Sequence, residues 1–381
     1  MSAVTSPQRA AAAAVSTTVA TVCPVFLVGG LSVQMADELG FSAAGLGLAV
    51  ALYFSSSALV SVWTGRLVER VGVRGTAVAA ILLSAVSLAG IAASVHYLML
   101  VAVLVLAGPA NSLGQLSSNA LLAKRVPAHR QGLLFGVKQA AVPASTTLAG
   151  ISVPVVALTV GWRWAFVLAA LLAAAALTVL PKRVAAPATR PPVRRRPSRA
   201  LVVITVAGAF GATAANPLGS FIADYAVFRG VSEAAAGLTV TLGGLAGVSA
   251  RIGVGWLADR RDGGRLTMIA VMLATGAAGL AMLATPVAWI IPVGTAVGFA
   301  LGWAWPGLLN FAVTRTHPDA PAAATGVTQT GVYLGGAIGP LGFGALVDLS
   351  GYPVAWSAMA VLMVVGAVLM VIGRRMLLAL R

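Results

Sequence analysis

The chain has 381 residues, of which 59% are hydrophobic and only 9% are charged, and its mean hydropathy is +0.96. A water-soluble domain of this size needs a far larger charged surface, so the composition excludes that class. The formal net charge is +16, but the positions of the basic residues explain this excess, and we expect no nucleic-acid partner. One cysteine, Cys23, and three scattered histidines predict no disulfide framework, no metal site and no cofactor.

Long apolar segments recur along the whole chain, and their length is that of membrane-spanning helices rather than of alternating barrel strands. The sequence predicts twelve spans, over residues 11–33, 43–63, 76–94, 97–122, 132–158, 163–180, 200–222, 233–257, 266–285, 288–313, 322–346 and 354–373. Residues 181–199 are rich in proline and arginine, which predicts a solvated cytoplasmic linker. We therefore expect an all-α integral membrane protein, with six-helix bundles over residues 1–180 and 200–381.

Basic residues are distributed asymmetrically along this pattern. With a cytoplasmic N-terminus, all but four of the 25 basic residues fall in cytoplasmic connections and tails. The exceptions are Arg163 and Arg229, which fall on the outer side, and Lys138 and Arg251, which fall within spans. This bias predicts a multi-pass protein of the cytoplasmic membrane with both termini in the cytoplasm.

Three short segments recur after a constant shift of 190 residues, which indicates an internal duplication. They are GRLVER (65–70) and GWLADR (255–260), GVKQ (136–139) and GVTQ (326–329), and GW (161–162) and GY (351–352). Duplicated membrane bundles typically hold a site between the halves near the middle of the membrane, and one half rocks against the other.

The six-plus-six arrangement and the segment after the second span resemble the major facilitator superfamily over essentially the whole chain. That family shows Gly-x-Leu-Ala-Asp-Arg-x-Gly-Arg here; residues 65–74 fit it with Glu69 in place of Asp, while the second copy has Asp262 where glycine is expected. The resemblance implies a cytoplasmic gate, in which the first acid approaches the eleventh span and the second acid the fifth. It assigns gating roles to Gly65, Glu69, Arg70, Arg74, Gly255, Asp259 and Arg260. The alternative is that both segments are only charged turns.

All nine acidic residues fall in loops or at span ends, whereas two cations fall within spans. Lys138 lies six residues past the start of the fifth span and Arg251 six residues before the end of the eighth, so each is about 9 Å from the cytoplasmic face. In the family fold these spans are neighbours, so we interpret the two cations as an anion-binding pair. The alternative is that Lys138 snorkels to the surface and Arg251 pairs with Asp259, Glu69 or backbone carbonyls.

Neutral polar residues on several spans suggest a hydrated path around these cations. Asn111, Gln115 and Asn119 recur at every fourth residue and so share one helix face. The predicted substrate-binding set is Lys138, Arg251, Gln139, Asn111, Gln115, Gln329, Tyr333 and Trp305. For each polar residue alone, the alternative is an ordinary hydrogen bond between helices, worth about 0.6–2 kcal/mol.

The sequence predicts a secondary active transporter that moves a small solute, an organic anion, by alternating access. It predicts no enzyme, because no nucleophile–base arrangement or nucleotide-binding loop is present. Two alternatives stay open: a proton-driven efflux antiporter for drugs or metabolites, and a non-transporting membrane receptor. The expected partners are a small-molecule substrate, H⁺ as a candidate coupling ion and the lipid bilayer, and we expect a monomer.

Overall fold

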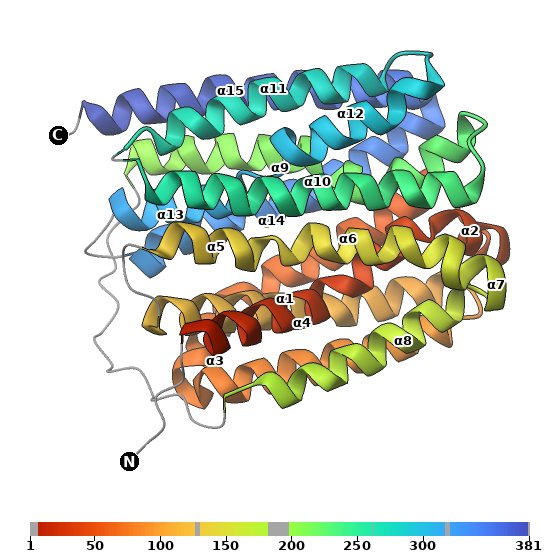
Figure 1. The fold of residues 1–381 in the computed structure, drawn as a ribbon, viewed down its shortest axis with the longest axis horizontal. Helices are drawn as coiled ribbons and strands as arrows, with labels where there is room; N and C mark the ends of the chain where they lie inside the picture. The colour runs from red at the N-terminus through yellow and green to blue at the C-terminus, as the bar shows by residue number, and fades with distance from the viewer. Residues whose placement is uncertain (1–6, 126–129, 182–197, 262, 317–320, 380–381) are drawn as a thin grey trace.

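The computed structural model describes residues 7–125, 130–181, 198–261, 263–316 and 321–379. Over these ranges the chain is almost wholly helical without strands, and twelve helical segments are long and apolar enough to cross a membrane. The helices lie side by side along the longest axis, and both termini lie at the same end (Figure 1). We call this end the termini face and the opposite end the far face. The predicted all-α fold of twelve spans in two bundles is confirmed.

The N-terminal bundle consists of α1 (Pro7–Gly30), α2 (Ser32–Leu39), α3 (Ala43–Ala92), α4 (Tyr97–Arg125), α5 (Gln131–Gln139), α6 (Ala141–Ser152), a π-helix (Val153–Ala157), α7 (Leu158–Val160), α8 (Trp162–Ala175) and a 3-10 turn (Ala176–Val179). The C-terminal bundle consists of α9 (Arg199–Phe228), α10 (Glu233–Asp259), α11 (Arg265–Leu283), a 3-10 turn (Ala288–Ile290), α12 (Ile291–Val297), a π-helix (Gly298–Gly302), α13 (Pro306–Thr316), α14 (Pro321–Ser350) and α15 (Tyr352–Leu378). Most of the predicted linker, residues 182–197, lies outside the described residues.

The second and third predicted spans, found at Ala43–Ser61 and Arg70–Ala92, are joined inside α3 by a sharp turn at Gly72 (φ 83°, ψ 162°), where the backbone is not helical. The connection expected over residues 64–75 is therefore present but shorter than expected, because the chain is helical on both sides of Gly72. Glycine allows the bend because it lacks the Cβ that makes positive φ costly for other residues. The first residues of the motif, 65–70, therefore lie on the last turns of the helix that ends at Gly72.

The duplication is visible in the backbone as well as in the sequence. Ser42 and Ser232, 190 residues apart, are the N-caps of α3 and α10, and each side chain accepts a hydrogen bond from the backbone N–H three residues later. Gly161 (φ 98°, ψ 151°) and Gly351 (φ 82°, ψ 168°) have the same separation, and each precedes a span. The two halves thus share their turn chemistry at equivalent positions.

The two bundles approach each other along glycine-bearing helix faces. α6 packs along α10 (Figure 1), and α3 packs along α14. A Cβ added to Gly136 in α5 would stand 2.5 Å from the carbonyl oxygen of Arg251, and one added to Gly47 in α3 would stand 2.3 Å from that of Pro340. Carbon and oxygen atoms do not pack at such distances, so any larger residue at these positions would push the bundles apart.

At the far face, Arg163 connects helix ends within the N-terminal bundle. Its Nη1 donates to Glu38 Oε2 at 2.7 Å and its Nη2 to the Ser94 carbonyl at 3.0 Å, while Trp162 Nε1 donates to the same carboxylate oxygen at 2.8 Å. Arg163 and Trp162 hold the pKa of Glu38 below its ordinary value, because they bind the ionised form. This contact therefore contributes at neutral pH and is lost as the pH falls through that lowered pKa.

The conformation of Gly161 gives a stability prediction. Gly161→Ala should lower the free energy of unfolding by about 1–3 kcal/mol, because this backbone region is open almost only to glycine. A Cβ at Gly161 would meet no atom within 4 Å, so the effect isolates backbone strain. Thermal denaturation of the detergent-solubilised protein measures it as a lower Tm.

The matched control is Gly253→Ala, which adds the same methyl group inside α10, where a Cβ also meets nothing within 4 Å. Alanine is the better helix former, so this variant should be unchanged or more stable by up to about 1 kcal/mol. Equal Tm values for the two variants would contradict the assignment of strain to Gly161.

Candidate functional site

A small cavity of about 70 Å³ lies where the two bundles meet. Its lining residues are Val22, Phe26, Phe54, Asn111, Gln115, Gln139, Val142, Ala212, Asn216, Arg251, Trp303, Trp305, Pro306, Gln329, Val332 and Tyr333. Seven of the eight residues predicted to bind substrate are among them. The eighth, Lys138, does not line the cavity but is hydrogen-bonded to Gln115, which does. The fold thus brings the predicted set together, and its binding role stays a prediction.

Arg251 connects the two bundles at this cavity. The side chain is 3% exposed, its Nη1 donates to the Gln139 carbonyl of α5, and its Nη2 donates to the Trp303 carbonyl at 2.6 Å. The guanidinium carbon also lies 5.6 Å from the centroid of the Trp303 ring, within cation–π range. Its Nε has no hydrogen-bond partner among the described residues. Backbone carbonyls are therefore the partners of Arg251 here, rather than Asp259 as the sequence also allowed.

Breaks in two helices make these carbonyls available, the first caused by a proline four residues after Gln139 and the second lying next to Trp303. In a continuous helix the Gln139 carbonyl would accept the N–H of residue 143, but Pro143 has none, and the span divides into α5 and α6. A second break lies before Pro306, where Trp305 Nε1 donates to the Gly302 carbonyl at 2.9 Å. Broken backbone is tolerated inside a membrane only where the freed groups find new partners. The Arg251 guanidinium supplies such partners at both breaks.

Lys138 is buried rather than snorkelled. Its side chain is 1% exposed, and its ammonium donates to Gln115 Oε1 in α4. One turn along the same helix, Asn111 Nδ2 donates to Ser57 Oγ at 3.2 Å, and Asn111 Oδ1 has no partner among the described residues. Asn119, the third member of the polar stripe, does not line the cavity. The stripe therefore faces the cavity over its first two members only.

The lining combines one cation with amides and aromatic rings. Among the sixteen lining residues that the structure describes, Arg251 is the only charged one and none is acidic. The rings of Phe26 and Trp303, one from each bundle, meet edge to face at 5.4 Å between centroids. Burying an ion without a counter-ion costs several kcal/mol, and neutral amides and carbonyls offset only part of that cost. The described residues around Arg251 therefore compensate its charge only in part.

Nine of the sixteen lining residues were absent from the predicted set: Val22, Phe26, Phe54, Val142, Ala212, Asn216, Trp303, Pro306 and Val332. The sequence offered a signal for Asn216, because it is a polar residue before Pro217 in an otherwise apolar span. Phe26 could then have been found as the residue equivalent to Asn216 in the first repeat. The sequence offered no signal for Phe54 as a lining residue, because a phenylalanine in a span usually packs against lipid or protein. Five pairs of positions related by the 190-residue shift line the cavity: Val22 and Ala212, Phe26 and Asn216, Gln115 and Trp305, Gln139 and Gln329, and Val142 and Val332.

At the termini face, Asp259 holds α10 against α5. Its Oδ1 and Oδ2 accept hydrogen bonds from the backbone N–H groups of Gly132 and Leu133, at 2.8 Å each. A carboxylate is favoured there because the first N–H groups of a helix lack partners and its N-terminus carries positive dipole charge. Gly255 permits the close approach, since a Cβ on it would stand 2.6 Å from the Gly132 carbonyl oxygen. We call this contact the termini-face latch.

Asp259 thus lies where the motif implies, and a comparison of the whole sequence agrees. The chain matches the family model of the Major Facilitator Superfamily over residues 11–340 and again over residues 201–376. The chain belongs to the major facilitator superfamily. It is accordingly a secondary transporter in a membrane, and the receptor alternative loses its support.

The other gating residues of this major facilitator protein are less completely described. Arg260 lies over the ring of Trp256, 3.8 Å from its centroid, and Arg70 and Arg74 are exposed at the bend of α3. The surroundings of Gly65 and the side chain of Glu69 lie outside what the structure describes. The expected contact between Glu69 and the eleventh span therefore stays a prediction.

A second latch joins the two bundles of the transporter at the far face, and the sequence did not predict it. Asp348, near the end of α14, accepts hydrogen bonds from Ser42 Oγ at 2.7 Å and from the Ala44 N–H at 3.2 Å. Nearby, Gln34 Nε2 donates to Glu233 Oε2 at 2.5 Å. Both latches use the same chemistry: an aspartate of the C-terminal bundle binds the N-terminus of a helix in the N-terminal bundle. The two bundles are thus fastened at both ends around the cavity.

The far-face latch gives a prediction about access to the cavity. In a Cys23→Ala background, Val332→Cys places a single thiol in the cavity lining. Adding Asp348→Asn should raise the rate at which a membrane-impermeant maleimide labels this thiol from the far face by about tenfold, because hydrogen bonds to a charged group stabilise the closed state by about 1.5–3 kcal/mol. Gel-shift labelling in proteoliposomes measures the rate.

Asp37→Asn is the matched control, since it removes the same charge from an exposed residue of α2 at the same face. Its labelling rate should equal that of the parent. If Asp348→Asn and Asp37→Asn label at one rate, the contact between Asp348 and Ser42 does not hold the bundles together.

Proposed function

We propose that the protein transports a small organic anion across the cytoplasmic membrane by alternating access. The observation that carries this proposal is the charge of the central site. Arg251 lines the cavity, Lys138 is buried one hydrogen bond away, and no acidic side chain lines the cavity to balance them. A transported carboxylate would supply the missing negative charge, and its oxygen would accept from the unpartnered Arg251 Nε.

The size of the cavity constrains how the solute is held. At about 70 Å³, the closed cavity has room for roughly two water molecules or one carboxylate group. The rest of the solute would displace the aromatic side chains that line it, among them Phe26, Phe54 and Trp303. We therefore infer a monocarboxylate with a compact apolar body, bound when one of the two latches is open.

The two latches support the alternating-access part of the proposal. Opening of the Asp259 latch would admit the solute from the termini face, and opening of the Asp348 latch would admit it from the far face. Because each latch is a carboxylate on free N–H groups that water also satisfies, each opens at moderate cost. We infer that the termini face is cytoplasmic, since most of the described arginines in connections and at span ends lie there, among them Arg70, Arg74, Arg260, Arg261, Arg265, Arg315, Arg374 and Arg375. We further infer that the protein works as a monomer, with H⁺ as a candidate coupling ion.

One observation favours a second candidate, a proton-driven efflux antiporter for drugs or metabolites. The cavity lining contains five aromatic residues, which suit flat apolar compounds as well as small anions: Phe26, Phe54, Trp303, Trp305 and Tyr333. In proteoliposomes, an imposed pH gradient would drive efflux of the cationic dye ethidium if this candidate holds. The organic-anion proposal predicts no such efflux.

A thermal-shift screen provides the first test of substrate class. Benzoate, acetate and succinate are compared with ethidium on the purified protein. Ligand binding to the folded state raises the Tm by mass action, and we expect the largest rise with benzoate. Stabilisation by ethidium and by none of the anions would overturn the proposal.

Variants of the two cations give the second test. Arg251→Gln should reduce uptake of the stabilising anion at low concentration by roughly ten- to hundredfold, because a hydrogen bond to a charged group contributes about 1.5–3 kcal/mol. Lys138→Gln should reduce this uptake less, since Lys138 does not line the cavity and contacts it only through its hydrogen bond to Gln115. The effect should appear mainly in KM, measured as initial uptake of radiolabelled anion in proteoliposomes.

Because Arg251 also binds two backbone carbonyls, its variant needs a stability control. The Tm of each variant is measured alongside uptake, and Arg251→Lys keeps the charge while losing the two-pronged geometry. Arg375→Gln removes one positive charge from an exposed position on α15 and should leave uptake unchanged. Full uptake by both Arg251→Gln and Lys138→Gln would exclude the cation pair as the anion site.

A further inference from the structure

Side-chain amides from both bundles line the central cavity: Asn111, Gln115, Gln139, Asn216 and Gln329. An amide has two N–H donors at one end and an acceptor oxygen at the other. A partner at one end therefore determines which end is left to face a solute. For Gln115, Asn216 and Asn111 the structure describes such a partner, and in each case its chemistry fixes the orientation of the amide.

Gln115 presents a donor to the cavity. Its Oε1 accepts from the Lys138 ammonium, and an ammonium can only donate, so the reversed amide would lose this bond. Its Nε2, at the other end of the amide, has no hydrogen-bond partner among the described residues. The bond to a charged donor also polarises the amide, which strengthens its N–H groups as donors. Lys138 thus fixes Gln115 as a donor toward the solute.

Asn216 presents an acceptor to the same cavity. Its Nδ2 donates to the Ala212 carbonyl, one turn earlier in α9, at 2.8 Å. A carbonyl can only accept, so this amide is also fixed. The side chain is 5% exposed, and its Oδ1 has no hydrogen-bond partner among the described residues. The C-terminal bundle therefore offers the solute an acceptor oxygen.

Asn111 has the same orientation chemistry in the N-terminal bundle. The Ser57 hydroxyl donates to the backbone carbonyls of Tyr53 or Gly108, at 2.9 Å and 2.8 Å, so its oxygen is left to accept from Asn111 Nδ2. Asn111 Oδ1 has no partner among the described residues, but it is fully buried in this closed arrangement. Asn216 Oδ1 is not fully buried and is therefore the acceptor that the closed cavity presents.

A carboxylate alone does not match this set of groups. Its oxygens suit the donors Arg251 Nε and Gln115 Nε2, but it has no hydrogen to give to Asn216 Oδ1. When such a solute expels water from the cavity, the acceptor is left unpaired, which disfavours binding. A site with a buried acceptor discriminates against solutes that lack the matching donor. The solute therefore needs a donor besides its carboxylate.

The charge of the surroundings decides between a hydroxyl and an ammonium as this donor. Arg251 lines the cavity, Lys138 is buried one hydrogen bond away, and none of the sixteen described lining residues is acidic. Both cations would repel an ammonium, and no described carboxylate at the cavity would compensate it. A hydroxyl donates the same hydrogen bond without a charge.

We propose that the transported anion is a hydroxycarboxylate. This inference rests on the proposed function, because it specifies the organic anion that the cavity takes. The carboxylate accepts from Arg251 and Gln115 of the two bundles, and the hydroxyl donates to Asn216 Oδ1. Asn216 is thus a residue that determines specificity rather than one that binds the negative charge.

Three solutes of one shape test this proposal: phenylacetate, mandelate and phenylglycine. They carry a hydrogen, a hydroxyl and an ammonium on the same carbon atom, next to the carboxylate. Isothermal titration calorimetry of the purified full-length protein measures their affinities at neutral pH. The tighter-binding enantiomer of mandelate should bind about two- to tenfold more tightly than phenylacetate, the ratio expected for one added hydrogen bond. Phenylglycine should bind more weakly than both.

Asn216→Leu removes the acceptor while keeping a side chain of similar size that suits a helix. In this variant mandelate and phenylacetate should bind with about the same affinity. The matched control is Asn119→Leu, the same change at a residue of α4 that does not line the cavity. This control should keep the ratio of the wild type.

The measurements on the wild type decide the proposal even if Asn216→Leu does not fold. Equal affinity for mandelate and phenylacetate would overturn the hydroxycarboxylate while the organic-anion proposal still held. Tightest binding of phenylglycine would instead identify an amino-acid site and also overturn it. A wild-type ratio in Asn216→Leu would show that another group binds the hydroxyl, against the role given to Asn216. If none of the three carboxylates bound, the organic-anion proposal itself would fail, and this inference with it.

Discussion

The contact between the Arg251 guanidinium and two backbone carbonyls is the constraint on which the centre of the molecule depends. Spans broken at Pro143 and before Pro306 leave carbonyls without partners, and in the membrane interior no bulk water can satisfy them. Arg251 binds the carbonyls of Gln139 and Trp303, one from each bundle. It therefore permits the broken helices that shape the cavity. It also places one positive charge at the meeting point of the halves.

The contact of Arg251 at the centre of the molecule differs from the contacts of Asp259 and Asp348 at its two ends, which water can replace. The glycine faces on α5, α10, α3 and α14 bring backbones into contact without interlocking side chains, so the bundles can roll on one another. Asp259 and Asp348 then close opposite ends by binding the N-termini of α5 and α3. Water can replace either carboxylate at those N–H groups, which keeps the cost of opening small compared with that of unpairing Arg251.

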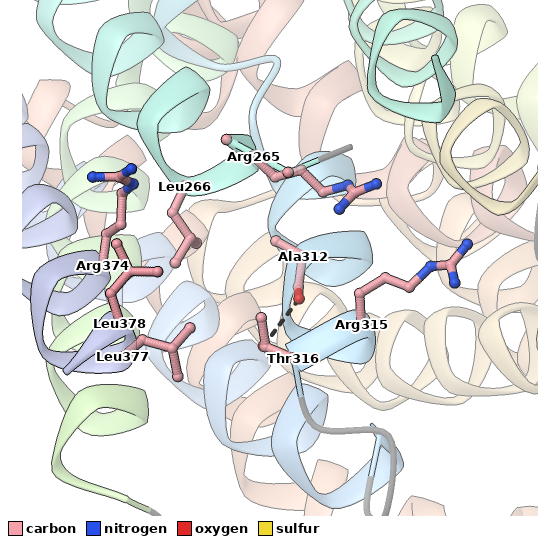
Figure 2. A pocket seen from close by; sticks show the side chains of 10 residues that line it. Arg265, Leu266, Ala312, Arg315, Thr316, Arg374, Leu377 and Leu378 are labelled. Carbon is pink, nitrogen blue, oxygen red and sulfur yellow. Dashed lines mark hydrogen bonds between the residues drawn. The ribbon is translucent and has the colours of Figure 1, made fainter. Parts of the chain in front are cut away.

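The basic residues outside the membrane interior and the two buried cations have different kinds of partner. Outside the membrane interior, arginines bind groups at helix ends: Arg163 binds Glu38 and the Ser94 carbonyl, and Arg265 donates to the carbonyls of Ala258 and Arg261. Arg265, Arg315 and Arg374 also line a pocket of about 460 Å³ at the termini face (Figure 2). Within the membrane interior, the two buried cations have neutral partners only. A positive charge whose protein partners are neutral can exchange them for an anion without breaking an ion pair. A carrier that must both bind and release its solute benefits from that property.

The sequence by itself determined the class of fold. An apolar run of about twenty residues in a membrane finds no water for its backbone N–H and C=O groups, and a helix satisfies them all within the run. The sequence also determined the duplication, since repeated turn residues such as Ser42 and Ser232 are local features, and the buried cations, since a charge in an apolar run is visible without coordinates. Only the tertiary structure decided the rest. The partners of Arg251 are carbonyls, which carry no side-chain signature, and the connection between the second and third spans is shorter than expected because the backbone is helical on both sides of Gly72. Asp348 reaches Ser42 across 306 residues, and such contacts depend on how the two bundles pack, which no local pattern encodes.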